Sequence, residues 1–359
     1  MTKTIDSQAT IPPFNDEAAR AAREYQLCLT KPDGSLGRLE ELAVWYAGCR
    51  GQFPVAAPNN IQLVVFAADH GVVDEGVSAY PQAVTAAMVA NFVAGGAAVN
   101  ALAKASGVGV TVVDVGVAAD LSHLPEAGAA RFVSAKVRSG SSNLRRGPAL
   151  STADALAALA VGARIATESC AAGADILAAG EMGIGNTTSA AALTCAFTGA
   201  APEDAVGRGT GIDDAGLARK LEVVRDAVKR HGGDHKEPLQ SLAALGGLEI
   251  AAMAGLMIGG ARVRVPTIVD GFISSAAALV ACRLEPNVRP YLCFAHLSQE
   301  RGHQLLLAAL AARPLFDLGL RLGEGTGAVL AAQLVRAAVT AQAEMATFKS
   351  AEVPNKAPA

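Results

Sequence analysis

Short apolar runs alternate with Ala-rich segments of helical spacing from residue 61 onward. The runs are rich in β-branched side chains, and each one ends in a small or polar cluster. They span residues 62–67, 108–113, 176–179, 265–269 and 291–294. This alternation is typical of βαβ units, in which helices cover both faces of a buried parallel sheet. The pattern therefore predicts an α/β fold with a parallel sheet flanked by helices.

The first fifty residues have helical spacing instead. One helix is expected to begin at Asp16, and a second to cover 36–47 after a turn at 32–34. The longest apolar stretch, 242–261, has the length of a membrane span. It contains Glu249 and several glycines, so we interpret it as a buried helix and expect no membrane segment. Residues 1–20 have no apolar core of a signal peptide, which favours a cytoplasmic protein.

The amino-acid composition limits the classes of molecule that this protein is expected to bind. Hydrophobic residues make up 51% of the chain, aromatic residues only 4%, and the net charge is -3. Nucleic-acid binders usually carry a clustered basic excess, so we expect no nucleic-acid partner. The six cysteines form no C-x-x-C pair, which indicates free thiols in a reducing compartment.

Polar residues follow each predicted strand. These strand ends are Asp69-His70-Gly71, Asp114-Val115-Gly116, 180–188, Asp270-Gly271 and His296-Leu297-Ser298. Ligands of open α/β sheets bind at the carboxyl ends of the strands. We therefore expect all five ends to converge on one crevice.

Two glycine clusters are candidate anion sites. In the segment 180–188, Gly183 and Gly185 would let backbone N–H groups approach an anion. Asn186, Thr187 and Thr188 could cap the following helix, although a tight turn with an exposed Glu181 fits this segment as well. The cluster 207–211 could cradle a phosphate with Arg208 or Lys220 adding charge, or be a plain loop.

Glu324 lies between two glycines, where packing alone explains a carboxylate poorly. The glycines would permit close approach of a ligand. A desolvated Glu324 would have a raised pKa, as a general base requires. The alternative is a solvated side chain at a helix N-terminus. The histidines suggest no metal site, because Gly232-Gly233 separates His231 from His235.

Several segments together resemble one family, the nicotinate-nucleotide:dimethylbenzimidazole phosphoribosyltransferases of cobalamin lower-ligand synthesis. The resemblance rests on KPDGSLGRLEELA (31–43), AADHGVVDEGVSAYPQAVT (67–85), GEMGIGNTTSAAAL (180–193), GGLEIAAMAGLMIGGA (246–261), VDGFISSAAAL (269–279), HLSQERG (296–302) and LRLGEGTGA (320–328). It implies a Rossmann-like large domain, a small helical domain from both termini, a homodimer, and neither metal nor cofactor. We place the N-terminal part of the small domain at 1–60, the catalytic domain at 61–328, the returning C-terminal helix at 329–350 and a flexible tail at 351–359.

The resemblance also implies roles for individual residues. Glu324 falls on the family's proton acceptor, and Glu181 on a carboxylate close to the reacting centre. The family's phosphate contacts fall on Gly183, Gly209, Lys220 and Ser298, and Leu322 falls on the wall of the base pocket. From the Gly-rich segment itself we add Asn186 and Thr187 as candidate substrate-binding residues. Tyr80 and Met88 stand where some members place serine and glutamine in the base pocket, and Gly-Thr-Gly stands where some relatives have Gly-Ala-Asn.

The expected reaction moves ribose 5-phosphate from nicotinate mononucleotide to 5,6-dimethylbenzimidazole, giving α-ribazole 5′-phosphate and nicotinate. Two alternatives stay open at this point. One is an enzyme of the same fold that uses another acceptor, such as a purine, another benzimidazole or a phenol. The other is a non-catalytic nucleotide-binding module, which would have no need for Glu324 between two glycines.

Overall fold

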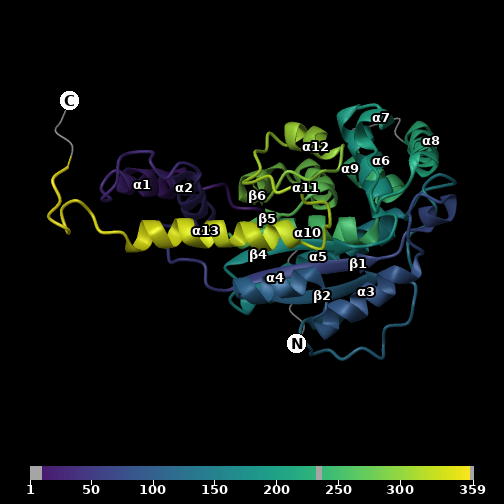
Figure 1. Ribbon diagram of the computed structural model, residues 1–359, viewed down its shortest axis with the longest axis horizontal. Helices are drawn as coiled ribbons and strands as arrows, with labels where there is room; N and C mark the ends of the chain where they lie inside the picture. The colour runs from purple at the N-terminus through teal and green to yellow at the C-terminus, as the bar shows by residue number, and fades with distance from the viewer. Residues whose placement is uncertain (1–9, 232–236, 356–359) are drawn as a thin grey trace.

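The computed structural model describes residues 10–231 and 237–355 and contains a six-stranded, all-parallel sheet (Figure 1). The strand order is β3-β2-β1-β4-β5-β6. The strands are β1 Ile61–Ala68, β2 Val108–Gly116, β3 Arg131–Ser134, β4 Ile176–Met182, β5 Thr267–Val269 and β6 Leu292–Phe294. This is the doubly wound Rossmann order, whose crevice opens beside the switch point between β1 and β4. The predicted fold class is confirmed.

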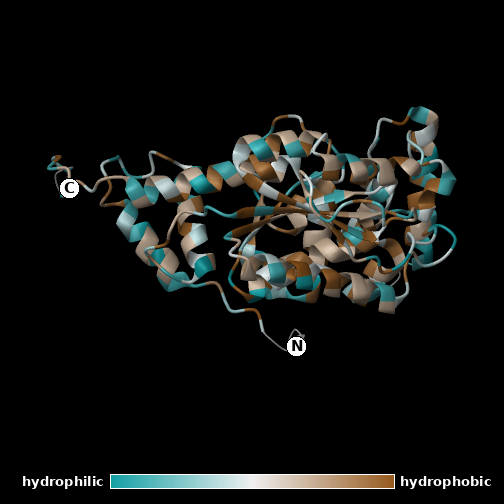
Figure 2. Cartoon of the chain, turned by 90° about the horizontal axis from the view of Figure 1, so that it is seen from below, coloured by the Kyte–Doolittle hydropathy of each residue, from teal (hydrophilic) through white to brown (hydrophobic). Residues whose placement is uncertain are grey.

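Helices cover both faces of the sheet. They are α1 Asp16–Gln26, α2 Arg38–Arg50, α3 Ala83–Ala94, α4 Ala98–Ser106, α5 Thr152–Ala171, α6 Asn186–Thr198, α7 Pro202–Ala205, α8 Asp214–His231, α9 Pro238–Leu245, α10 Leu248–Arg262, α11 Phe272–Leu284, α12 His303–Ala309 and α13 Thr326–Glu344, with 3-10 turns at Gly71–Glu75 and Pro286–Tyr291. One buried cluster joins the sheet to α5, α6, α10 and α11, and another joins it to α3, α4 and α13. Figure 2 shows the hydrophobic residues gathered in the strands and in the faces that meet them.

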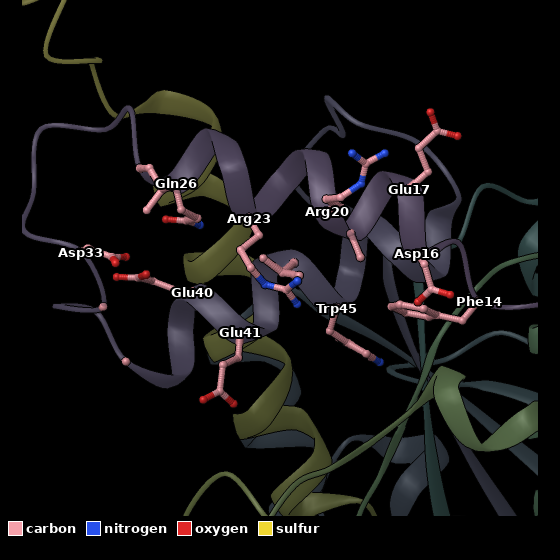
Figure 3. A pocket seen from close by; sticks show the side chains of 15 residues that line it. Phe14, Asp16, Glu17, Arg20, Arg23, Gln26, Asp33, Glu40, Glu41 and Trp45 are labelled. Carbon is pink, nitrogen blue, oxygen red and sulfur yellow. The ribbon is translucent and has the colours of Figure 1, made fainter.

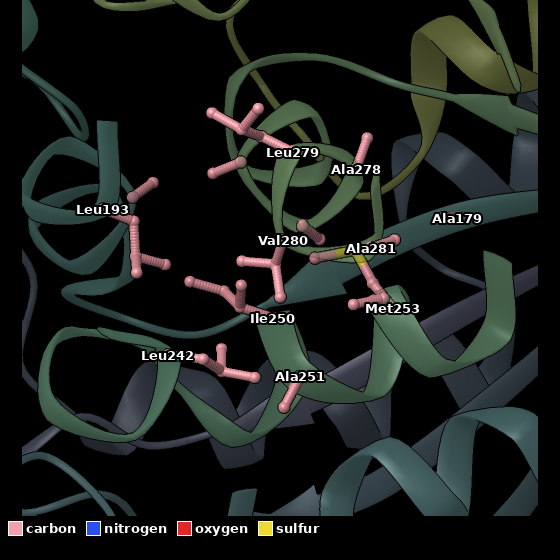
Figure 4. Close-up of a cluster of buried hydrophobic side chains, with 14 of the residues drawn as sticks. Ala179, Leu193, Leu242, Ile250, Ala251, Met253, Ala278, Leu279, Val280 and Ala281 are labelled. Atoms are coloured by element: carbon pink, nitrogen blue, oxygen red, sulfur yellow. The ribbon is translucent and has the colours of Figure 1, made fainter. Parts of the chain in front are cut away.

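In the cluster that contains α5 and α10, the close packing of these two helices depends on small residues. A Cβ on Gly255 of α10 would lie 2.0 Å from the carbonyl oxygen of Leu159, and one on Gly259 would lie 2.9 Å from the Cα of Ala163. Glycine therefore lets α10 lie directly against α5. On the opposite side of α10, Ile250 and Met253 lie among the buried side chains drawn in Figure 4.

The expected helix over 242–261 is wrong in one respect, because α9 and α10 are separate. The break falls at Gly246-Gly247, and a Cβ on Gly247 would lie 2.4 Å from Cε1 of the His70 ring. A stretch that is long and apolar enough to cross a membrane is Ala83–Ser106. In the structure this stretch is α3 and α4, which are separated at Gly95 with φ +86° and pack on the sheet.

Other differences concern strands. The sequence pattern missed β3, a four-residue edge strand with only Phe132 fully buried. Two predicted strands run further, since β2 reaches Gly116 and β4 reaches Met182. Glu181 is therefore part of a strand and not of a loop.

The N-terminal helices and the end of α13 form a helical extension beside the sheet (Figure 1). The Gln26 side chain donates to Oε1 of Gln342 at 2.9 Å, and the backbone N–H of Thr30 donates to the carbonyl of Ala346 at 3.0 Å. The helix expected over 329–350 begins at Thr326 and ends at Glu344. One straight helix thus connects the extension to the residues that follow Glu324.

Candidate active site

A cleft of about 750 Å³ opens at the carboxyl ends of β4, β5 and β6. Ten of the predicted site residues line it: Tyr80, Met88, Glu181, Gly183, Asn186, Thr187, Gly209, Ser298, Leu322 and Glu324. They come from six separate segments, and the fold brings these together at one edge of the sheet. Lys220 lies just behind the wall, in contact with Thr187 and near Gly209.

Glu181 is held by two donors at the end of β4. Its Oε2 accepts from the Asn186 side chain, and its Oε1 accepts the backbone N–H of Glu324 at 3.4 Å. Burial raises the pKa of Glu181 to about 8, and the negative charges of Glu249 and Asp270 add to this, while the bond from Asn186 opposes it. Both oxygens are therefore occupied, and the group is largely protonated at neutral pH.

Glu324 is 6% exposed, and its Oε2 is buried without a hydrogen-bond partner. Burial raises its pKa, a hydrogen bond from the Val99 backbone lowers it, and the charge of Asp270 raises it. This carboxylate lines the cleft with one oxygen free to accept a proton. A solvated Glu at a helix N-terminus is thus the wrong alternative.

The segment after β4 does not cap α6 as expected. The helix follows Gly185, with φ +94°, and no side chain caps it. The Asn186 amide is bonded to Glu181, and Thr187 Oγ1 accepts from the Lys220 ammonium at 2.8 Å. Asn186 and Thr187 are therefore directed to neighbouring site residues and not to the helix.

Lys220, on α8, is fully buried, and its ammonium also donates to the Gly207 carbonyl at 3.2 Å. Burial lowers its pKa to about 8, and the nearby charge of Glu300 opposes this effect. Gly209 has φ +52°, and a Cβ there would lie 3.1 Å from the ammonium nitrogen. Gly209 and Thr210 line one corner of the cleft and Lys220 lies directly behind them, so N–H groups and a positive charge, which a phosphate requires, are close together here.

The cleft also has a more apolar part of its lining, which includes Tyr80, Met88 and Leu322. Tyr80 and Leu322 are 53% and 56% exposed. The Thr210 hydroxyl accepts the backbone N–H of Ala79 at 3.1 Å. This bond connects the loop before Tyr80 to the glycine cluster, so these two parts of the cleft are joined.

The expectation that all five strand ends meet in the cleft is wrong for two of them. Asp114 does not line it, and neither do Asp69 and His70. His70 is fully buried, with Nε2 2.8 Å from Oε1 of Glu249 and Nδ1 3.1 Å from the Ser189 hydroxyl. A Cβ on Gly183 would lie 3.3 Å from the His70 ring, so this buried pair lies beneath the Gly-rich segment.

The cleft has further polar residues that were not assigned individually from the sequence, among them Asp270, His296, Glu300 and Arg321. Asp270 and His296 were visible as strand ends and lie in VDGFISSAAAL and HLSQERG, two of the segments that carry the family resemblance, but neither was given a role. Among residues 10–231 and 237–355, no group of three or more His, Cys, Asp or Glu side chains is placed to hold a metal ion. His235 lies outside these residues.

A second hollow, a groove of about 1230 Å³, lies on the helical extension (Figure 3). It is lined mainly by α1, α2 and the loop between them, including Arg20, Arg23, Asp33 and Glu41. These four side chains are exposed. We call it the helical groove.

The strand order and the buried carboxylates in a cleft at the sheet edge are features of an α/β enzyme with a small-molecule site. A family model described as phosphoribosyltransferase matches residues 11–353. The chain belongs to the nicotinate-nucleotide–dimethylbenzimidazole phosphoribosyltransferase family. This membership excludes the non-catalytic binding module.

The relatives are similar over almost their whole length. The nicotinate-nucleotide–dimethylbenzimidazole phosphoribosyltransferase of Chromobacterium violaceum is 52% identical over 96% of this chain and 98% of its own. The enzyme of the same name from a Roseiflexus species is 50% identical over 99% of both chains. The crystal structure of CobT from Thermus thermophilus has a TM-score of 0.89 and 47% identity, covering 95% of this chain and all of its own.

Proposed function

We propose that this enzyme transfers ribose 5-phosphate from nicotinate mononucleotide to 5,6-dimethylbenzimidazole, with Glu324 as general base. The observation that carries the proposal is the buried, unpaired Oε2 of Glu324 in a cleft with a phosphate corner. The named substrates of relatives about 50% identical over nearly the whole chain support the choice of donor and acceptor.

The chemistry requires one proton acceptor. The bond between ribose C1′ and the cationic pyridinium nitrogen breaks, and its electron pair neutralises the leaving ring. A nitrogen of the acceptor forms the new bond to C1′, and its proton passes to the Glu324 carboxylate. Because the ring departs without needing a proton, no general acid is required.

Glu181 and Lys220 have supporting roles in this proposal. Glu181 accepts the backbone N–H of Glu324, so it orients the base. Lys220, Thr187, Gly209, Gly183 and Ser298 hold the donor phosphate, and Tyr80, Met88 and Leu322 contact the acceptor base. The exposed Tyr80 can accommodate other flat rings, so the identity of the native base is tested below.

We also propose a cytoplasmic homodimer. Leu318, near the cleft, is 64% exposed, and Leu27 on the helical extension is 53% exposed. A second copy could cover these apolar side chains. Analytical ultracentrifugation at micromolar protein tests this, and a monomer would contradict it.

The test of the reaction is incubation with nicotinate mononucleotide and 5,6-dimethylbenzimidazole, followed by chromatography of nicotinate and the nucleoside phosphate. Glu324→Gln should lower kcat by about 10²–10⁴, roughly 3–5 kcal/mol of barrier. Glu41→Gln, in the helical groove, is the matched control and should stay within about twofold, because groups remote from the chemistry contribute no transition-state binding.

A loss below about threefold in a folded Glu324→Gln variant would contradict the assigned base. Absence of turnover with 5,6-dimethylbenzimidazole, together with turnover of a purine, another benzimidazole or a phenol, would change the acceptor and keep the reaction class.

A further inference from the structure

Asp270 follows β5 and holds the first turn of α13. It is 4% exposed and lines the cleft. Its Oδ1 accepts the backbone N–H of Ala328 at 2.8 Å, and the backbone N–H groups of Gly325 and Gly327 also bond to its carboxylate. These donors immediately follow Glu324 in the chain. Asp270 therefore acts as a cap from a neighbouring strand, where the helix has no side-chain cap of its own.

The backbone of Glu324 needs such support. Its φ is +63°, a conformation that residues other than glycine adopt at a cost in free energy. On one side, Gly180 leaves no space for a side chain, because a Cβ there would lie 2.5 Å from the Glu324 carbonyl oxygen. The first turn of α13, bonded to Asp270, follows on the other side. Strand β4 and Asp270 thus hold the strained residue between them.

Glycine also lets Asp270 approach the helix. A Cβ on Gly327 would lie 2.9 Å from Oδ1 of Asp270 and 2.1 Å from Cδ2 of His296. His296 Nε2 is 3.9 Å from Oδ1 of Asp270. The L-G-E-G-T-G segment therefore contains a glycine whose role is to admit this carboxylate and this imidazole beside the base.

We propose that Asp270 is a positioning residue, which fixes the conformation of Glu324 for proton transfer, and that its negative charge acts on the Glu324 carboxylate because both groups line the same cleft. This inference rests on the proposed role of Glu324 as general base.

The charged and polar groups that face Glu324 come from four elements. They are Glu181 from β4, Asp270 after β5, His296 after β6 and the backbone N–H of Val99 in the first turn of α4. Burial is the largest cause that raises the pKa of Glu324, the Val99 bond opposes it, and Asp270 raises it further. Burial also raises the pKa of Asp270, while His296 and the three N–H donors favour its charged form.

The first experiment measures the single-turnover rate against pH for Asp270→Asn. Asparagine keeps an acceptor oxygen for Ala328 but removes the charge. Because Glu324 acts when deprotonated, loss of a nearby negative charge lowers its pKa. The acid limb should move to lower pH by about 0.5–1.5 units, the shift expected from one charge at an effective dielectric constant of about 20.

Asp114→Asn is the matched control. Asp114 is also a buried aspartate near the end of a strand, and its Oδ1 accepts the backbone N–H of Val117 at 2.8 Å, but it does not line the cleft. Its variant should leave the acid limb in place. An unmoved limb in Asp270→Asn, a move to higher pH, or an equal move in Asp114→Asn would overturn the electrostatic role.

The positioning role is tested by Asp270→Ala, which removes the cap. Its plateau rate should fall by about 10²-fold, the effect of misplacing a catalytic group by about 1 Å, while Asp270→Asn stays within about tenfold of the unmodified enzyme. KM for both substrates should change by less than about threefold, because the binding groups remain. If both variants keep the unmodified plateau rate, Asp270 does not position the base.

These experiments distinguish a failure of Glu324 as general base from a failure of the inference on Asp270. An active Glu324→Gln variant would contradict the general base itself. An inactive Glu324→Gln variant, together with unchanged Asp270 variants, would contradict only the inference on Asp270.

Discussion

The cleft at the sheet edge and the helical groove differ in how far their charged side chains are exposed to solvent. The groove is the larger, at about 1230 Å³ against about 750 Å³. Several of its charged side chains lie in solvent, such as Arg20, whose side chain is 65% exposed and pairs with Glu24. In the cleft, Glu181 and Glu324 are 7% and 6% exposed. Exposed ion pairs contribute little to stability, whereas desolvated carboxylates can serve as bases near neutrality. The burial of carboxylates therefore identifies the candidate active site better than the volume of the cavity does.

The sharpest comparison replaces one glycine in each region. A Cβ at Gly180 would meet the backbone of Glu324, so Gly180→Ala should displace the base and lower kcat by about 10²-fold. Gly34 lines the helical groove with φ +72° and has nothing within 4 Å of a Cβ. Gly34→Ala should cost about 1–2 kcal/mol of stability and leave kcat unchanged. Steady-state kinetics and thermal unfolding measure both, and equal kcat values would break the contrast.

Removal of a cation should also separate the regions. Lys220→Met should raise KM for nicotinate mononucleotide by about 10–100-fold, the value of a charge-assisted hydrogen bond, whereas Arg20→Met should not change it. Because the pKa of Lys220 is lowered to about 8, its charge is lost as pH rises above that value. Donor affinity of the unmodified enzyme should therefore fall on the alkaline side. If KM for nicotinate mononucleotide changes neither in Lys220→Met nor at alkaline pH, Lys220 does not bind the donor phosphate.

The smallest effect concerns stability against pH. The pKa of Glu181 is raised to about 8 from 4.5, so the stability it contributes is complete below about pH 4.5 and is lost as pH rises through about 8. Glu181→Gln stays neutral. The difference in Tm between this variant and the unmodified enzyme should therefore shift in favour of the variant by about 2–5 °C from pH 5 to pH 9. Glu41→Gln, on the exposed groove, is the control, and an equal dependence on pH there would contradict the effect of burial.

Much of the fold follows from local pattern. Five of the strands came from apolar runs, because strands buried on both faces must be continuously apolar. Strand β3 did not, because an edge strand with one fully buried residue carries no such signal. The split between α9 and α10 was missed for another reason. It depends on the contact between Gly247 and the His70 ring, which is far away in sequence.

Residue types and their spacing along the chain were enough to predict the α/β class, to reveal the family resemblance and to select Glu181 and Glu324 as candidate site residues. The tertiary structure alone decided which strand ends share the cleft. It placed Asp270 at the helix that follows Glu324 and put His70 beneath Gly183, out of the cleft. Asp270, which follows β5, lines the cleft, whereas Asp114, inside β2, does not. Burial and charge–charge distance are properties of the packed chain, and they decide which carboxylate can act as a base.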